Sequence, residues 1–478
     1  MTILESALIG LAERLPLFDW LRHAEFELAL FAAFWFVIGA ADEIAIDLTW
    51  LWLRLVRRHR THHLAESFAG RPLLGQIAVL IPAWNEAAVI GATVSHALKA
   101  WPQAELRLYV GCYRNDPATL AAAMTAAGLD SRVRLIVHDR DGPTTKADCL
   151  NRLYGAVVED EERGGARLRA LLLHDAEDMV HPAALSLIDL ALVDADFVQI
   201  PVRPEPRAGA RWIGGHYLDE FTEAHAKAMV VRDRIGAALP AAGVGCAFSR
   251  DVLDRLARLR AIDGGEGPFE AECLTEDYEM GLLIGRSGGV SKFLRLRDTD
   301  GTLIATRSYF PESLSEAVRQ KTRWIHGIAF QGWERLGWPA RLVDVWMALR
   351  DRRGPLVALV LAFAYFLLIL GPVLALAEWF GLAGPRLSGP VLDGLVKICL
   401  AALAWRMLAR FVFTAREYGV IEGARAVLRI PIANIISIIA GRRAFVSYVR
   451  SLGGVAPIWD KTEHRVHPAT VLTAEATA

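Results

Sequence analysis

The chain has 478 residues, of which 53% are hydrophobic, and its mean hydropathy is +0.28. This composition is unusual for a purely soluble protein and predicts a globular part joined to membrane segments. A net charge of −1 and a pI near 6.9 exclude the generally basic surface that binds nucleic acid. The five cysteines are widely spaced without a Cys-x-x-Cys pair, so neither a disulfide framework nor a cysteine zinc site is expected.

Residues 1–60 are expected to form an N-terminal membrane segment. One crossing is predicted over residues 27–51, where Asp42, Glu43 and Asp47 interrupt an apolar run. Carboxylates at membrane depth are unfavourable unless they face protein or water, so we expect this end to pack against other helices. By the positive-inside rule, the arginines that follow predict a cytosolic side: Arg54, Arg57, Arg58 and Arg60.

Residues 61–350 are expected to form a cytosolic α/β domain, because short apolar segments alternate with helical stretches. This alternation is typical of a doubly wound parallel sheet. The expected strands are 76–81, 106–111, 133–137, 170–173 and 196–200. Carboxylates or amides follow several of these strands, and open α/β sheets bind ligands outside the carboxyl ends of their strands. A binding site is therefore predicted at that edge of the sheet.

The apolar strand 170–173 is followed closely by Asp175, Glu177 and Asp178. While the chain stays extended, Asp175 and Glu177 point to the same side, so both could face a hard cation such as Mg²⁺ or Mn²⁺. Asp178 lies close by as a second ligand or a supporting group. The alternative is a solvated acidic turn before a helix that begins near Pro182.

A second acidic motif is Thr275-Glu276-Asp277, followed by an apolar helical face. An aspartate at the start of a helix can act as a general base toward an acceptor hydroxyl. A helix capped by Thr275 with glutamate in its first turn is the alternative. Lys146, at the start of an earlier helix, could neutralise a diphosphate, although a solvated lysine in a polar turn is the simpler interpretation.

A helix beginning at Pro311-Glu312-Ser313-Leu314 is expected to carry Gln320, Arg323 and Trp324 on one face. A guanidinium group binds phosphate through two hydrogen bonds, and an indole offers a flat apolar surface to a sugar ring. The alternative is an interfacial helix that rests its tryptophan at the membrane.

Residues 351–445 are expected to hold the C-terminal transmembrane and interfacial helices. Crossings are predicted over 355–382 and 390–414, which makes three in total, with four as the alternative. The apolar stretch 430–440 covers about half a span and has arginines on both sides, which favours a re-entrant or interfacial helix on the cytosolic face. Residues 446–478 are expected to be a cytosolic segment ending in a flexible tail.

Five motifs, taken in order, resemble those of inverting family 2 glycosyltransferases of the membrane-embedded, processive kind related to cellulose and hyaluronan synthases. They are Pro82-Ala83-Trp84-Asn85-Glu86 with Asp116, Lys146, Asp175-Ala176-Glu177-Asp178, Thr275-Glu276-Asp277, and Gln320-Lys321-Thr322-Arg323-Trp324. The motif His174 to Asp178 with His181-Pro182, and the acidic first membrane segment, further resemble the NfrB type, the bacteriophage adsorption protein B. Residues 459–464 resemble the cytosolic gating segment of these synthases.

The resemblance implies a GT-A fold, the nucleotide-diphospho-sugar transferase domain, flanked by transmembrane helices. It implies a donor nucleotide site made of Pro82, Asn85, Glu86, Asp116, Lys146 and Asp175. The implied Mg²⁺ or Mn²⁺ ion is held by Asp175 with Glu177 or Asp178, because the usual Asp-x-Asp is here Asp-Ala-Glu-Asp. The implied catalytic residues are Asp277, as base, and Glu276. The implied acceptor and pyrophosphate residues are Gln320, Arg323, Trp324, Gly245 and Cys246.

These observations together predict a multi-pass protein of the bacterial inner membrane with a cytosolic, metal-dependent glycosyltransferase domain. It is expected to transfer sugar from a UDP-sugar to a growing polysaccharide, coupled to export, with an envelope or outer-membrane partner. The alternatives are a single-sugar transferase acting on a lipid carrier, and a non-catalytic membrane receptor or scaffold.

Overall fold

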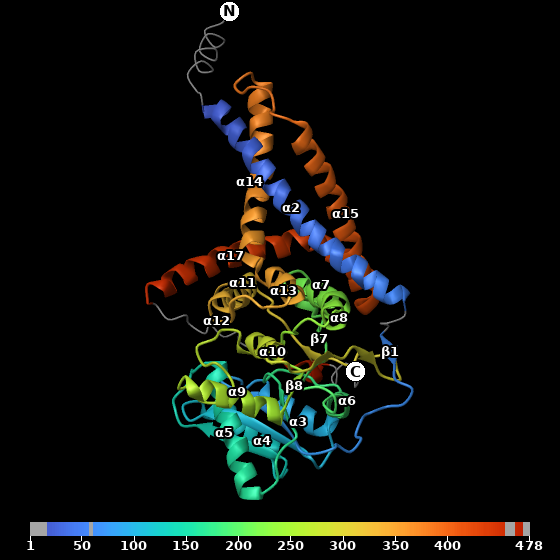
Figure 1. Cartoon of the computed structure of the whole chain (residues 1–478), viewed down its shortest axis with the longest axis vertical. Helices are drawn as coiled ribbons and strands as arrows, with labels where there is room; N and C mark the ends of the chain where they lie inside the picture. The colour runs from blue at the N-terminus through green and yellow to red at the C-terminus, as the bar shows by residue number, and fades with distance from the viewer. Residues whose placement is uncertain (1–16, 57–60, 455–463, 472–478) are drawn as a thin grey trace, which may run out of the picture.

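The computed structural model describes residues 17–56, 61–454 and 464–471. An α/β domain lies at one end of the molecule and a group of long helices projects from the other, with shorter helices between them (Figure 1). The predicted arginine cluster falls partly on residues 57–60, and the predicted gating segment falls mostly on 455–463. Those parts of both predictions lie outside the described residues.

A seven-stranded sheet in the order β4-β3-β2-β5-β8-β6-β9 forms the centre of the α/β domain. All pairs are parallel except those of β8, which runs antiparallel to both β5 and β6. The strands are β2 (Ile77–Pro82), β3 (Leu106–Tyr113), β4 (Val133–His138), β5 (Ala170–Leu173), β6 (Phe197–Gln199), β8 (Cys246–Ser249) and β9 (Ser291–Phe293). Two small parallel pairs lie outside this sheet: β1 (His62–His63) with β10 (Leu296–Arg297), and β7 (Val202–Pro204) with β11 (Thr306–Ser308).

The predicted doubly wound α/β fold is confirmed, and the five expected strands all form within one or two residues of their predicted ends. The antiparallel β8 was not expected. Gly243 and Gly245 precede it with φ of +75° and +59°, a region that favours glycine, and they turn the chain back into the sheet. The resulting strand Cys246–Ser249 lacks the run of large apolar residues that marks β5, a strand of the same length, in the sequence.

Successive side chains of each strand point to opposite faces of the sheet, so the hydrophobic core forms one layer on each face. Ile77, Val79 and Ile81 face one side of the sheet, while Ala78 and Leu80 face the other. The first side is covered by α3 (Ile90–Ala100), α4 (Pro117–Ala127) and α6 (Ala184–Ala191). The second is covered by α5 (Lys146–Gly164), α9 (Arg250–Ile262) and α10 (Glu276–Arg286). Because both faces are buried, the central strands β2 and β5 are apolar throughout, whereas β3 and β4 carry Arg107 and Arg134 near their starts.

Shorter helices connect this domain to the long ones (Figure 1). They are α7 (Gly215–Glu223), η2 (Ala224–Ala228), α8 (Met229–Arg234), α11 (Leu314–Ile325), η3 (His326–Gln331), α12 (Gly332–Leu336) and α13 (Leu342–Arg352). The turns η2 and η3 are π-helical. Arg429 joins the two parts, because its fully buried guanidinium lies 2.5 Å from carboxylates of both Asp219 in α7 and Glu422.

Three long helices stand side by side away from the α/β domain: α2 (Leu17–Leu55), α14 (Gly354–Trp379) and α15 (Pro390–Tyr418) (Figure 1). These correspond to the three predicted crossings. By length and composition, the helices able to cross a membrane within the described residues are α2, α14 and α17 (Ile430–Leu452), so the predicted crossing over 390–414 is not among them. Lys397, Arg406 and Arg410 make α15 the more polar helix.

The helix α17 follows α16 (Val420–Leu428) and runs across the base of the other long helices (Figure 1). An interfacial helix was expected over 430–440, but the helix continues to Leu452 and is therefore 23 residues long. The expectation of half a span was wrong because the arginines from Arg442 onward do not end the helix. Its length would allow a crossing, whereas its direction in the structure agrees with the interfacial arrangement.

The acidic end of α2 packs against other helices, as expected. Asp47 lies 2.5 Å from the Lys227 ammonium of η2, and Glu43 lies 2.5 Å from the Arg353 guanidinium. Asp42 accepts a hydrogen bond from Trp346 of α13 at 2.8 Å. These partners compensate carboxylates that would otherwise be unfavourable near a membrane.

Candidate active site

The loop after β5 carries the acidic motif and folds back on itself. The carboxylate of Asp178 accepts hydrogen bonds from the backbone N–H of Asp175 at 2.9 Å and from Nδ1 of His174 at 2.8 Å. Asp178 is 1% exposed, so its side chain is directed into the protein. Asp175 and Glu177 instead line a cavity of about 890 Å³. Asp175 and Glu177, which were expected to point to the same side, therefore both line this cavity. Asp178 supports the loop that carries them.

The large cavity, which we call the catalytic cavity, brings together residues from segments far apart in the chain. Of the predicted site residues, it is lined by Pro82, Glu86, Lys146, Asp175, Glu177, Glu276, Asp277, Gln320, Arg323 and Trp324. The remaining predicted site residues lie beside it rather than in its lining: Asn85, Asp116, Asp178, Gly245 and Cys246.

Asp116 and Asn85 shape the turn after β2. The carboxylate of Asp116 accepts the backbone N–H of Asn85 at 2.6 Å and, as the N-cap of α4, that of Thr119 at 3.3 Å. Asn85 has a φ of +54°, which asparagine tolerates better than most residues. This turn places Glu86, which is 2% exposed, at the cavity. In the structure, Asp116 thus positions the turn through its side chain.

Lys146 is the first residue of α5 and its Nζ lies 2.5 Å from Oδ1 of Asp175. The N-cap Thr145 fixes the helix start by accepting the Asp148 N–H at 3.1 Å. Burial opposes the charged form of Lys146, but Asp175, Glu276 and Asp277 outweigh it and raise the pKa of this ammonium. Burial likewise opposes ionisation of Asp175, yet the Lys146 ammonium lowers the pKa of Asp175. This pair is therefore a charged pair at neutral pH.

Glu276 and Asp277 occupy the first turn of α10, as the motif predicts. Burial and the neighbouring Asp277 raise the pKa of Glu276 to about 7. Burial also raises the pKa of Asp277, although the Lys146 ammonium opposes it. Thr275 precedes the helix but its side chain caps no backbone N–H. The simple capping interpretation of this threonine is therefore wrong, and the motif presents two carboxylates of raised pKa to the cavity.

The helix α11 begins with a capping box formed by Ser313 and Glu316, as its sequence indicates. Gln320, Arg323 and Trp324 all line the catalytic cavity from this helix. Trp324 packs edge-on against Tyr217 at 6.2 Å between ring centroids. The tryptophan thus lies at the cavity, in contrast to the alternative that rests it at the membrane.

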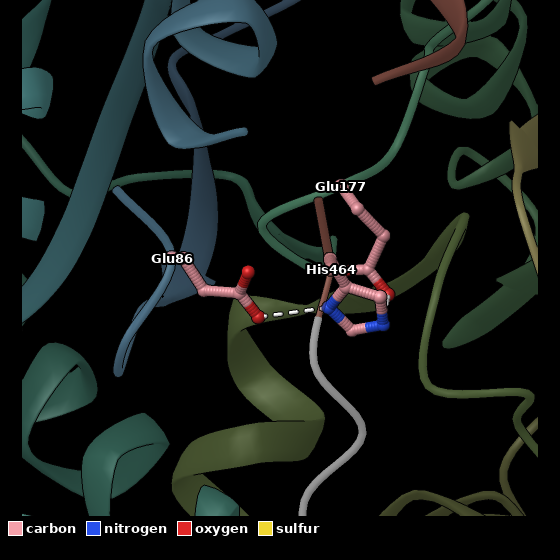
Figure 2. Close-up of side chains that lie close together, drawn as sticks. All are labelled: Glu86, Glu177 and His464. Atoms are coloured by element: carbon pink, nitrogen blue, oxygen red, sulfur yellow. Dashed lines mark hydrogen bonds and ion pairs between the residues drawn. The ribbon is translucent and has the colours of Figure 1, made fainter. Parts of the chain in front are cut away.

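His464 enters the catalytic cavity from the C-terminal part of the chain, and sequence reasoning did not include it among the site residues. Its Nδ1 lies 2.9 Å from Oε1 of Glu86 and its Nε2 lies 3.1 Å from Oε1 of Glu177 (Figure 2). Burial raises the pKa of Glu177 to about 8, although His464 opposes this shift. Glu86, Glu177 and His464 are close enough to offer three ligand atoms to one metal ion. The signal that could have found His464 was the resemblance of residues 459–464 to a gating segment.

The neighbouring His467 anchors the same C-terminal stretch. Its ring is 1% exposed, and Nε2 lies 3.1 Å from the backbone oxygen of Asp178. The acidic loop that continues from β5 is therefore contacted by a segment 289 residues later in the chain. The contact holds His464 beside Glu177.

Comparison with known proteins gives consistent matches over the same region. Residues 75–327 match the family described as glycosyltransferase like family 2. Bacteriophage adsorption protein B of Escherichia coli K12 is 31% identical over 456 residues, which cover 89% of this chain and 60% of that protein. Bacteriophage N4 adsorption protein B of Escherichia coli O157:H7 matches with the same identity and coverage. The chain thus spans about 60% of the length of these relatives.

Among solved structures, one match is glucosyl-3-phosphoglycerate synthase from Mycobacterium tuberculosis in complex with Mn²⁺, UDP and phosphoglyceric acid. The two chains are 18% identical, with a TM-score of 0.33. The aligned part covers 56% of this chain and 80% of that one.

Proposed function

Since this chain belongs to glycosyltransferase family 2, we propose that it transfers sugar from a UDP-sugar to an acceptor bound in the catalytic cavity. The observation that carries the proposal is the meeting, in one cavity, of Lys146, Arg323 and five carboxylates from three segments: Glu86, Asp175 with Glu177, and Glu276 with Asp277. Two cations suit a diphosphate, and a carboxylate of raised pKa suits a base.

Donor binding is assigned to the β2 and β5 side of the cavity. Glu86 lies at the end of the turn after β2, with Pro82 beside it, and is proposed to bind the nucleoside. Lys146 and Arg323 are proposed to neutralise the diphosphate, because both line the cavity and both lower the pKa of Asp175. Asn85 and Asp116 support this site through the turn they shape.

A divalent cation fits the acidic side of the cavity. Asp175 and Glu177 offer hard oxygen ligands, which suit Mg²⁺ or Mn²⁺, and His464 adds a nitrogen close to Glu177. We propose Asp175 and Glu177 as ligands, since the side chain of Asp178 is already held by His174. A bound cation would neutralise charge on the leaving diphosphate.

The proposed chemical step uses Asp277 as base. Its carboxylate takes the proton of the acceptor hydroxyl while the hydroxyl oxygen attacks the anomeric carbon. The bond from that carbon to the diphosphate oxygen breaks, and UDP leaves with the bonding electrons. Attack opposite the leaving group inverts the anomeric centre. Burial and the Asp175 carboxylate raise the pKa of Asp277, and Glu276, beside it in the first turn of α10, is proposed to assist at the same place.

The acceptor is assigned to the α11 side of the cavity. Trp324 offers a flat face for a sugar ring, and Gln320 offers an amide on the same helix face. Gly245 and Cys246, beside the cavity in β8 and the turn before it, are proposed to shape the acceptor end. The α11 helix packs against α17, so the acceptor side faces the long helices. This arrangement supports elongation coupled to export across an inner membrane, with the catalytic domain cytosolic and an envelope partner receiving the product.

The donor can be identified by incubating purified protein in nanodiscs with Mn²⁺ and a panel of UDP-sugars. We expect UDP release with one donor and, for an elongating enzyme, a ladder of labelled products. A single addition to a lipid acceptor would support the lipid-carrier alternative. Absence of UDP release with any donor, from protein that binds UDP, would contradict the proposed activity.

Gly243 offers a test of how tightly Asp277 is positioned. A Cβ at this glycine would lie 2.4 Å from Oδ2 of Asp277 and 3.3 Å from Nζ of Lys146. Gly243→Ala is therefore expected to displace the base and to lower UDP release roughly 10²-fold. Gly264→Ala is the matched control, because Gly264 has a similar φ of +78° but nothing within 4 Å of its Cβ position. Equal activity of the two variants would show that Asp277 need not stay where the structure places it.

A further inference from the structure

A second cavity, apart from the catalytic one, lies where α2 and α15 end beside the α/β domain. It measures about 190 Å³, and we call it the interface cavity. Its lining includes four guanidinium groups and one carboxylate: Arg54, Arg295, Arg297, Arg416 and Glu417. Among the described residues, the two cavities share no lining residue. The interface cavity is therefore strongly basic in a chain whose net charge is −1.

The single acidic side chain in this lining is already shared among arginines. Oε2 of Glu417 accepts a hydrogen bond from Arg297 at 2.7 Å and lies 3.5 Å from Arg295. Its Oε1 lies 3.6 Å from a third arginine, Arg203. Arg203 also pairs with Glu205, so within the cavity lining the Glu417 carboxylate is shared by Arg295 and Arg297.

Arg295 shows the excess of positive over negative charge in this cavity most clearly. Its side chain is 9% exposed, and its Nη1 donates to Oγ1 of Thr61 at 2.7 Å. Its Nε is buried and has no hydrogen-bond partner within the described part of the chain. Burial lowers the pKa of Arg295 to about 10 despite Glu417, and Arg297 and Arg54 contribute to the shift. A buried guanidinium with an unused donor is unfavourable unless an anion completes its hydrogen bonds.

The opposite wall of the interface cavity is aromatic and rigid. Trp50 packs against Phe413 at 5.2 Å between centroids and donates its indole N–H to the backbone oxygen of Ala226 at 2.9 Å. The guanidinium of Arg54 lies over the Trp50 ring at 4.7 Å. These contacts hold the ends of α2 and α15 together, so the guanidinium groups around the cavity belong to a fixed frame.

Exposed apolar side chains flank the interface cavity on both helix ends. Leu51 and Leu55 of α2 are 39% and 81% exposed, and Val420 and Ile421, just after α15, are 69% and 70% exposed. The helix α2 is long and apolar enough to cross a membrane, and its predicted crossing ends at residue 51, three residues before Arg54, so lipid headgroups are expected near the interface cavity. A cavity of this charge between apolar flanks has the form expected for a lipid headgroup site.

We propose that the interface cavity binds a phosphate group, and that its position favours the headgroup of an anionic membrane phospholipid as the source. The phosphate oxygens would accept hydrogen bonds from the guanidinium groups that line the cavity, those of Arg54, Arg295, Arg297 and Arg416, while the acyl chains follow the apolar flanks. The phosphate chemistry rests on the arginines alone, whereas the lipid source rests also on the membrane position of α2.

The test uses the full chain in detergent and measures Tm by tryptophan fluorescence during titration with three probes. The probes are dioctanoyl phosphatidylglycerol, dioctanoyl phosphatidylcholine and inorganic phosphate. We expect saturable stabilisation by phosphatidylglycerol at concentrations where phosphatidylcholine has little effect. In Arg295→Gln/Arg297→Gln the apparent Kd should rise about tenfold or more, because charge-assisted hydrogen bonds are lost.

Two further variants keep the test informative if the double variant folds poorly. Arg416→Gln removes an exposed charge from the lining and should raise the Kd severalfold without loss of folding. Arg134→Gln/Arg163→Gln removes two charges from the α/β domain, where both arginines pair with Asp160, and should leave the Kd unchanged.

The outcomes distinguish a lipid headgroup from inorganic phosphate as the ligand, and both from the absence of a phosphate site. Arginine-dependent stabilisation by phosphatidylglycerol alone supports the lipid headgroup. Equal arginine-dependent stabilisation by inorganic phosphate supports the phosphate site and overturns its assignment to lipid. Binding that is the same in wild type, Arg416→Gln and the double variant overturns the proposal.

Discussion

Asp277→Asn is expected to reduce UDP release by about 10²–10⁴-fold, the usual contribution of a general base. Asparagine keeps the shape of the side chain but cannot take the proton of an acceptor hydroxyl. UDP binding, measured by calorimetry, should change little, because the base acts on the acceptor and not on the nucleotide. Release that is unchanged in Asp277→Asn would remove the base assignment.

The pH profile gives an independent readout of the same residue. Burial raises the pKa of Asp277, and the base must be deprotonated to act. Wild-type activity should therefore fall as the pH decreases, and should begin to fall at a higher pH than an exposed aspartate would require. Any residual activity of Asp277→Asn should keep only the pH dependence that comes from Glu276 and Glu177, whose pKa values are about 7 and 8. A flat profile for wild type over that range would contradict the assignment.

Asp175→Asn is expected to reduce metal-activated UDP release by roughly 10²–10³-fold, because the proposed oxygen ligand to the cation and the charge partner of Lys146 are lost together. The expected signature is a much higher Mn²⁺ concentration for half-maximal activity. Chelation of the wild-type protein should abolish release, and added Mn²⁺ should restore it.

Asp178→Asn is the matched comparison, since it changes the same side chain three residues later. The structure commits this carboxylate to His174 and to the backbone N–H of Asp175. We expect a lower Tm with a Mn²⁺ requirement close to that of wild type. A loss of Mn²⁺ affinity in Asp178→Asn as large as in Asp175→Asn would make Asp178 the ligand and contradict the assignment of Glu177.

Much of the fold follows directly from local sequence. The strand Ala170–Leu173 lies at its predicted residues because an apolar run buried on both faces has sharp polar limits. Helix starts at Thr145 and Ser313 follow from capping side chains that accept backbone N–H groups. The matched family and the relatives confirm the resemblance inferred from the five motifs.

Other features depend on contacts between distant segments and so leave little local signal. The antiparallel direction of β8 is decided by the turn at Gly243 and Gly245 together with the place left between β5 and β6. His464 reaches Glu86 across 378 residues. The sequence could not separate Glu177 from Asp178 either, because the choice depends on which carboxylate His174 holds.

The interface cavity also depends on contacts between distant segments and could not be predicted from local sequence. Arg54 and Arg416 end long helices, and basic residues there are expected from charge placement around membranes. Arg295 and Arg297 belong to β10 and the residue before it, about 240 residues from Arg54 in the chain. Only the packing of α2 against α15 brings these groups around one space.

The most direct measurement is a cryo-electron microscopy map of the full chain in nanodiscs with UDP and Mn²⁺. The proposed function predicts density for UDP in the catalytic cavity, with its diphosphate beside Lys146 and Arg323 and a cation between it and the carboxylates of Asp175 and Glu177. UDP bound elsewhere on the chain, with the catalytic cavity unchanged, would contradict the account.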